Sequence, residues 1–136
     1  GDLLVPARDA ARFVAVGKIM QKYDVKKALT FHTFLEDADM LVEAAPYIPG
    51  MPTKVWCVKG SHRMKSQERN DILRQFEASK EPVLIASAKA LQEGVDLPAL
   101  DMVVLMDCKR SELDIVQTIG RAIRPGGDTP YAPVTV

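Results

Sequence analysis

The spacing of apolar residues changes several times along the chain, and the changes predict alternating helices and strands. Between Pro6 and Tyr23 apolar residues recur every three to four positions, the spacing of one buried helix face, and Pro6 suits a first helical turn. Residues 35–45 and 66–76 repeat this helical spacing. Other segments are short, rich in apolar and β-branched residues, and show no alternation, which indicates buried strands. These predicted strands are residues 27–33, 53–58, 83–86 and 102–106.

The C-terminal part of the chain predicts one more helix and one more strand. Ser111, followed by Asp114, resembles a capping box at the start of a helix. The Pro-Gly-Gly run at residues 125–127 ends that helix. Residues 131–136 are rich in β-forming residues and predict the beginning of a last strand.

The order of these elements predicts the fold class. Strands that do not alternate and are separated by helices are typical of a mainly parallel sheet with helices on both faces, which is an α/β fold. A chain of 136 residues is long enough for one such domain with a core of its own. In open sheets of this kind, ligands bind at the carboxyl ends of the strands.

Small hydroxyls and cations follow the predicted strands. Thr33 comes at the end of the first strand, Lys59 after the second and Ser87 after the third, and residues 107–110 after the fourth add two more cations. Hydroxyls, backbone amides and basic side chains are the groups that position phosphates in nucleic-acid-binding proteins. Hydroxyls also end strands and charges also fill loops in α/β proteins of many functions, so this pattern alone leaves a purely structural explanation open.

The charge balance limits where a polyanion can bind. Lysine plus arginine equals aspartate plus glutamate at 18 each, so the chain has no global field that attracts nucleic acid. Residues 54–69 nevertheless hold five basic residues and a single acid, Glu68. Any polyanion site is therefore expected to be a local patch that includes this segment.

The cysteines and the apolar runs argue against a metal site and a membrane segment. Cys57 and Cys108 are far apart, with no spacing of cysteine or histidine typical of a metal site. Two free thiols suit a reducing compartment, so we expect an intracellular protein of the cytoplasm, nucleoid or nucleus. No run approaches the roughly 18 apolar residues of a membrane span.

Two arginines near the C-terminus have the spacing of one helix face. Arg121 and Arg124 are three residues apart, and Gly120 leaves the backbone beside them uncovered. Guanidinium groups bind phosphate oxygens with two parallel hydrogen bonds, and in phosphoryl-transfer enzymes such a group neutralises charge on the transferred phosphate. A pair of this kind taken alone is more commonly a solvated basic surface.

Longer motifs give these arginines a context. Residues 85–98, which contain Glu-Gly-Val-Asp-Leu-Pro, look like motif V of the superfamily 2 helicases, and residues 117–124, Gln-x-x-Gly-Arg-x-x-Arg, look like their motif VI. Residues 28–33 resemble motif IV and residues 58–60 resemble motif IVa. The resemblance covers about residues 27–125 and is closest in style to DEAD/DEAH-like helicases of the restriction, phage or viral kind.

The resemblance implies a three-layer RecA-like domain, the second of the two lobes of an ATP-driven motor. It implies that Arg124 is the arginine finger on the γ-phosphate of ATP, and that Arg121 and Gln117 also face the nucleotide. Gly94 and Asp96 of motif V would approach the nucleotide as well.

The resemblance also implies nucleic-acid contacts. Thr33, Lys59 and Ser87 would contact the phosphates, and Ser87 stands where the family usually has threonine. Motif VI begins with Gln117, whereas RNA helicases commonly have histidine there, so DNA is expected in preference to RNA.

Two motifs of an ATP-hydrolysing lobe are absent. Gly17-Lys18 is followed by Ile19 and does not complete a Gly-x-x-x-x-Gly-Lys-Ser/Thr loop, and the chain contains no Asp-Glu dipeptide to hold magnesium. We therefore expect residues 1–136 to be one domain of a larger protein, inactive alone, with ATP and Mg²⁺ bound mainly by a first lobe of the same polypeptide.

Two other interpretations remain at this point. The chain could be a degenerate RecA-like lobe that serves as a protein-interaction scaffold, although intact Gln117, Arg121 and Arg124 argue against degeneration. A phosphate-binding metabolic α/β enzyme would need a glycine-rich loop after the first strand, and residues 33–36 do not form one.

Overall fold

The computed structural model describes residues 4–60, 63–88, 99–106 and 134–135, and helices and strands alternate from residue 7 to residue 88. Every strand and helix expected within these residues is present, with ends that shift by a few positions. The elements are α1 (Ala7–Lys22), β1 (Lys27–His32), α2 (Leu35–Ala44), the 3-10 helix η1 (Ala45–Tyr47), β2 (Lys54–Val58), α3 (Ser66–Ala78), β3 (Val83–Ala88), β4 (Met102–Met106) and β5 (Val134–Thr135).

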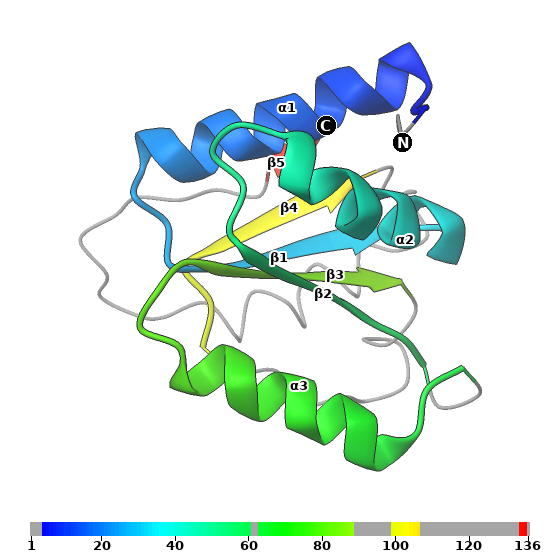
Figure 1. The fold of residues 1–136 in the computed structure, drawn as a ribbon, viewed down its shortest axis with the longest axis vertical. Helices are drawn as coiled ribbons and strands as arrows, with labels where there is room; N and C mark the ends of the chain where they lie inside the picture. The colour runs from blue at the N-terminus through cyan, green and yellow to red at the C-terminus, as the bar shows by residue number, and fades with distance from the viewer. Residues whose placement is uncertain (1–3, 61–62, 89–98, 107–133, 136) are drawn as a thin grey trace.

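The strands form one parallel sheet in the order β2-β3-β1-β4-β5. The central strand β1 pairs with β3 on one side and with β4 on the other. Helices α1 and α2 lie on one face of the sheet and α3 lies on the opposite face (Figure 1). The prediction of a three-layer α/β fold with a parallel sheet and helices on both faces is therefore confirmed.

Each face of the sheet has its own apolar cluster, which explains why the strands show no alternation in sequence. Ala28 of β1 belongs to the cluster with Phe13 of α1 and Leu41 of α2. The next residue, Leu29, belongs to the cluster with Phe76 of α3. Because successive side chains of a strand point to opposite faces and both faces are covered, every position in β1 is buried.

A buried lysine connects the beginning of the central strand to two other elements. Lys27 is 6% exposed, and its Nζ donates hydrogen bonds to the carbonyl oxygens of Glu77 at 3.0 Å and Ser79 at 3.1 Å. Its backbone N–H donates to Oδ2 of Asp101 at 3.0 Å, just before β4. The last turn of α3 holds no basic residue of its own, so the ammonium of Lys27 satisfies the carbonyls at that helix end.

The third strand is longer than its sequence indicates. The apolar run predicts a strand that ends at residue 86, but β3 continues to Ala88. Ser87 and Ala88 pair with Phe31 and His32 of β1, so the ladder with the neighbouring strand carries these two residues beyond the apolar run. The predicted helix with Arg121 and Arg124 lies outside the described residues.

Helix α1 approaches a turn of the chain so closely that only glycine fits at the contact. A Cβ atom on Gly17 would lie 2.3 Å from the carbonyl oxygen of Pro49, and one on Gly50 would lie 2.3 Å from the carbonyl oxygen of Gly17. Gly50 also has a φ of +86°, a conformation that side-chain-bearing residues rarely adopt. These two glycines set the distance between α1 and the turn that leads into β2.

We predict that Gly17→Ala destabilises the protein by about 1–3 kcal/mol, because the added methyl group meets a backbone carbonyl that cannot rotate away. The sign is informative, since the same change inside a helix ordinarily stabilises by about 1 kcal/mol. Chemical denaturation measures the free energy of unfolding. The control is Lys18→Ala at the exposed neighbouring position, expected to stay within about 0.5 kcal/mol. A Gly17→Ala protein as stable as the wild type would contradict the close packing.

Candidate nucleic-acid interface

The carboxyl ends of the parallel strands meet at one edge of the sheet, and the predicted phosphate-binding residues come from these ends (Figure 1). Strand β3 lies between β1 and β2, and its Ser87 is level with Phe31 on one side and Val58 on the other. Thr33 and Lys59 follow the last residues of β1 and β2. With about 4.8 Å between neighbouring strands, the two are separated by roughly 10 Å across the edge.

Thr33 is fixed between a strand and a helix. It follows His32, the last residue of β1, and precedes Phe34, whose carbonyl accepts hydrogen bonds from the N–H groups of Asp37 at 3.2 Å and Ala38 at 3.4 Å. These bonds form the first turn of α2. Half-buried Thr33 is thereby held at the carboxyl edge by regular structure on both sides.

Ser87 differs in position from the expectation. It lies inside β3 rather than after it, and it is 1% exposed. Its ladder partners Phe31 and Val58 belong to the apolar cluster on the α3 face, and side chains at the same level of neighbouring strands share a face. A contact between Ser87 and phosphate stays a prediction. The Ser87 hydroxyl is buried in this structure and would have to become exposed to make that contact.

Lys59 is half-buried and its side chain is paired. Its Nζ lies 3.6 Å from Oδ1 of Asp39 on α2. Its backbone carbonyl accepts a hydrogen bond from Nε of Arg69 at 3.1 Å, and Arg69, which is 9% exposed, also donates to the carbonyl of Met64 at 3.5 Å. Arg69 therefore holds the two ends of the loop between β2 and α3.

The sequence does not distinguish Asp39 or Arg69 from neighbouring charged residues. Arg69 is one of the five basic residues of 54–69, but its guanidinium donates to the backbone carbonyls of Lys59 and Met64. Asp39 is one of several acids near the start of α2, and nothing in the sequence separates it from Glu36 or Asp37. One signal for Arg69 is its position three residues before Ile72, which places it on the apolar face of the helix and predicts that it is buried.

Cys57 lies close to both Asp39 and Lys59. Cys57 in β2 and Lys59 just after it are two positions apart, so both point to the same side of the sheet, toward α2. Burial, the nearby charge of Asp39 and a hydrogen bond to Asp39 together raise the pKa of the Cys57 thiol to about 12, and the charge of Lys59 opposes the shift. The thiol therefore stays protonated at neutral pH and donates to the Asp39 carboxylate.

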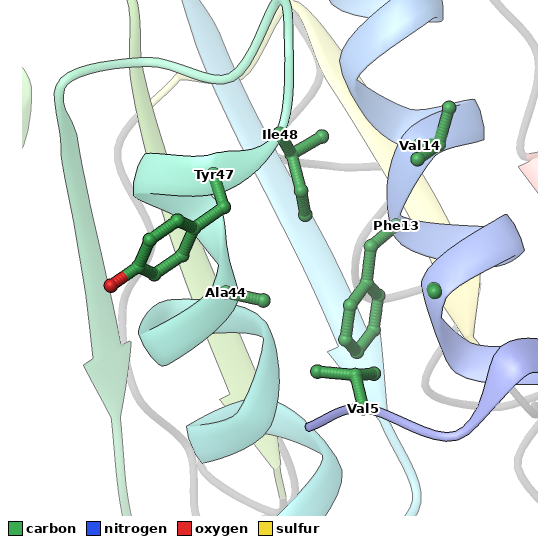
Figure 2. A pocket seen from close by; sticks show the side chains of 7 residues that line it. Val5, Phe13, Val14, Ala44, Tyr47 and Ile48 are labelled. Carbon is green, nitrogen blue, oxygen red and sulfur yellow. The ribbon is translucent and has the colours of Figure 1, made fainter. Parts of the chain in front are cut away.

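An apolar hollow of about 480 Å³ lies apart from this edge, between α1 and the segment from α2 to η1. Figure 2 shows Phe13 and Ile48 pointing toward it, with Val5 beside them. Among the described residues that line this hollow, none carries a charge. Its lining residues are Val5, Ala10, Phe13, Val14, Ala44, Tyr47 and Ile48.

The predicted nucleotide-facing residues cannot be placed in the same way. Gly94, Asp96, Gln117, Arg121 and Arg124 all lie outside the described residues, so their roles stay predictions. Within the described part of the chain, no three histidine, cysteine or acidic residues come together as a metal site. None of the described helices has the length and apolar character needed to cross a bilayer.

A family model described as "Helicase conserved C-terminal domain" matches residues 11–126, most of the chain. The chain belongs to this family. The resemblance to the second lobe of the superfamily 2 helicases is therefore confirmed.

Curated relatives support the assignment at moderate identity. The UvrABC system protein B of Levilactobacillus brevis is 32% identical over 114 residues, which cover 80% of this chain and 16% of that protein. The ATP-dependent RNA helicase dbp8 of Aspergillus oryzae is 27% identical over 124 residues, or 91% of this chain and 27% of that protein. The helicase lobe thus spans a sixth to a quarter of the length of these relatives.

Solved structures show that the fold is the RecA-like helicase fold. The yeast DEAD-box splicing factor Prp28 superposes with a TM-score of 0.70 at 22% identity, over 94% of this chain and 27% of that one. The E. coli DEAD-box protein SrmB gives a TM-score of 0.71 at 19% identity, over 93% of this chain and 71% of that one. At this identity the likeness concerns the fold alone.

We predict that Cys57 reacts slowly with iodoacetamide. Only the thiolate is nucleophilic, and a pKa raised to about 12 leaves little thiolate at pH 8. Alkylation in a Cys108→Ser background should be on the order of 10²-fold or more slower than that of a cysteine in an unstructured peptide. Asp39→Asn should accelerate it, because two causes of the raised pKa disappear. A rate equal to that of the peptide would contradict the buried, hydrogen-bonded thiol.

Proposed function

We propose that this helicase C-terminal domain is the second motor lobe of an ATP-dependent superfamily 2 helicase or translocase. In this proposal residues 1–136 are one domain of a larger, intracellular polypeptide whose first lobe binds ATP and Mg²⁺. The observation that supports it best is that Thr33 and Lys59, which follow two different strands, lie at the same carboxyl edge of the sheet within the region that matches the family.

The proposed role of this edge is to hold the sugar-phosphate backbone of a nucleic acid. The hydroxyl of Thr33 and the ammonium of Lys59 are donors suited to phosphate oxygens, with Ser87 as a third donor if its side chain becomes accessible. Backbone contacts carry no sequence information directly, so binding is weak and independent of sequence. The glutamine at the start of motif VI supports DNA over RNA, although the relatives include a protein named as an RNA helicase.

The proposed role of the C-terminal motifs is to complete a nucleotide site shared with the first lobe. Arg124 reaches the γ-phosphate, with Arg121 and Gln117 beside it, and Gly94 and Asp96 approach the nucleotide from motif V. The phosphate loop and the magnesium-binding acid are absent from the sequence, so the 136-residue chain alone does not turn over ATP.

We predict that Lys59→Ala weakens binding of a labelled oligo-dT by about 3- to 10-fold at low salt, because one cation leaves the phosphate-binding edge. The slope of log affinity against log salt should fall, by at most about one unit, because the carboxylate that Lys59 leaves takes up a cation from solution. Fluorescence anisotropy over a salt series measures both. Oligo-U of the same length, run in parallel, reports the preference between DNA and RNA.

The matched control is Lys80→Ala. Lys80 is an exposed lysine between α3 and β3, at the opposite, amino edge of the sheet. It should change affinity little. The proposed interface is wrong if Lys59→Ala leaves both affinity and salt slope unchanged in the 136-residue chain and in the full-length protein.

We predict that Arg124→Ala in the full-length protein lowers ATP turnover far more than it weakens ATP binding. A charge that acts as the phosphoryl group transfers contributes mainly in the transition state, and arginine fingers are worth on the order of 10³–10⁵ in turnover. Arg124→Lys should rescue poorly, because an ammonium cannot reproduce the planar fork of guanidinium. Steady-state ATPase with a thermal melt as folding control tests this, and near-wild-type turnover would refute the finger role.

A further inference from the structure

Asp39 links the proposed phosphate-binding lysine to the rest of the domain. It lies on α2, and two side chains from β2 and the residue after it interact with it: the ammonium of Lys59 at 3.6 Å and the thiol of Cys57. Cys57 of β2 and Lys59 just after it are two positions apart, so their side chains point to the same side of the sheet, toward α2. The Asp39 carboxylate is therefore already paired with the Lys59 ammonium that a nucleic-acid phosphate would need.

This ion pair has the character of an exchangeable contact. The side chains of Lys59 and Asp39 are 30% and 43% exposed, so water and salt screen their attraction. Pairs of this kind contribute little to stability. A phosphate offers Lys59 the same negative charge with more acceptor oxygens, so exchange of the carboxylate for a phosphate costs little.

The backbone of Lys59 does not need to move during such an exchange. Its carbonyl is held by buried Arg69, and the N–H groups of Arg63 and Met64 donate to the carbonyl of Gly60 at 3.0 and 3.1 Å. The long side chain of Lys59 can therefore turn from Asp39 toward a ligand at the edge while its base stays fixed.

We propose that Asp39 is a competing counter-ion that limits how tightly Lys59 holds a nucleic-acid phosphate. Each time a phosphate binds, Lys59 leaves the carboxylate, and each time the phosphate departs, the carboxylate takes the ammonium back. A moderate, rapidly reversible contact suits a motor lobe that must release the backbone at every step. This inference rests on the proposed nucleic-acid interface.

The test is Asp39→Asn, which removes the charge but keeps the shape and an oxygen that accepts from Cys57. We expect affinity for oligo-dT to rise about 2- to 5-fold at low salt, the range set by the modest strength of such pairs. The salt slope should become steeper, by up to about one unit, because no freed carboxylate takes up a cation from solution on binding. A merely structural role would not steepen the slope.

Two controls separate this effect from a general change of charge. Glu43→Gln removes one negative charge from an exposed position of the same helix, one turn further along, and should leave affinity nearly unchanged. Asp39→Asn should give no gain in a Lys59→Ala background. An equal gain in that background, or a gain from Glu43→Gln as large as from Asp39→Asn, would overturn the proposal.

The measurements distinguish two outcomes: that Asp39 does not compete for Lys59, and that Lys59 does not bind nucleic acid at all. If the wild type binds, Lys59→Ala weakens binding and Asp39→Asn has no effect, then Asp39 does not compete and only the inference falls. If Lys59→Ala has no effect, the interface falls as well. A thermal melt monitors folding, and Asp39→Ser replaces Asp39→Asn if the latter does not fold, with the same expected gain and the same overturning result.

Discussion

Parallel pairing of β1 with β3 and β4 is the constraint on which the rest of the structure depends. The pairing begins at Lys27, whose backbone N–H is bound by Asp101 and whose buried ammonium closes the end of α3. On the other side, the N–H of Val83 donates to the carbonyl of Lys26 at 2.8 Å. Once the register is fixed at this edge, the positions at which the strands end at the opposite edge are fixed as well.

That opposite edge combines a rigid backbone with exchangeable charges. The carbonyl of Lys59 is held by a nearly buried arginine, whereas its ammonium takes part in a half-exposed ion pair. Because electrostatic contacts weaken as water reaches them, the same residue can be firmly placed and loosely bound. The proposed polyanion-binding surface would need both properties, and they come from two different elements: Arg69 on α3 and Asp39 on α2.

The close contact of Gly17 with the turn at Gly50 fixes the position of α1 relative to the chain that leads into β2. It brings α1 against the turn that precedes β2, so the helix covers the sheet beside α2 (Figure 1). Backbone-to-backbone packing of this kind leaves no flexible side chain to absorb a change. The position of β2, and hence of Lys59, is thereby coupled to packing well away from the proposed interface.

The sequence by itself determined the layers of the fold and the family. Continuous apolar strands indicate burial on both faces, and the motifs around residues 85–98 and 117–124 carry the helicase resemblance because they are local runs of residues. Only the tertiary structure decided that Ser87 lies inside its strand, that Arg69 donates a hydrogen bond to the carbonyl of Lys59 and that Asp39 forms an ion pair with Lys59. These contacts join residues from different elements, and no local spacing encodes which acid of α2 will pair with the lysine that follows β2.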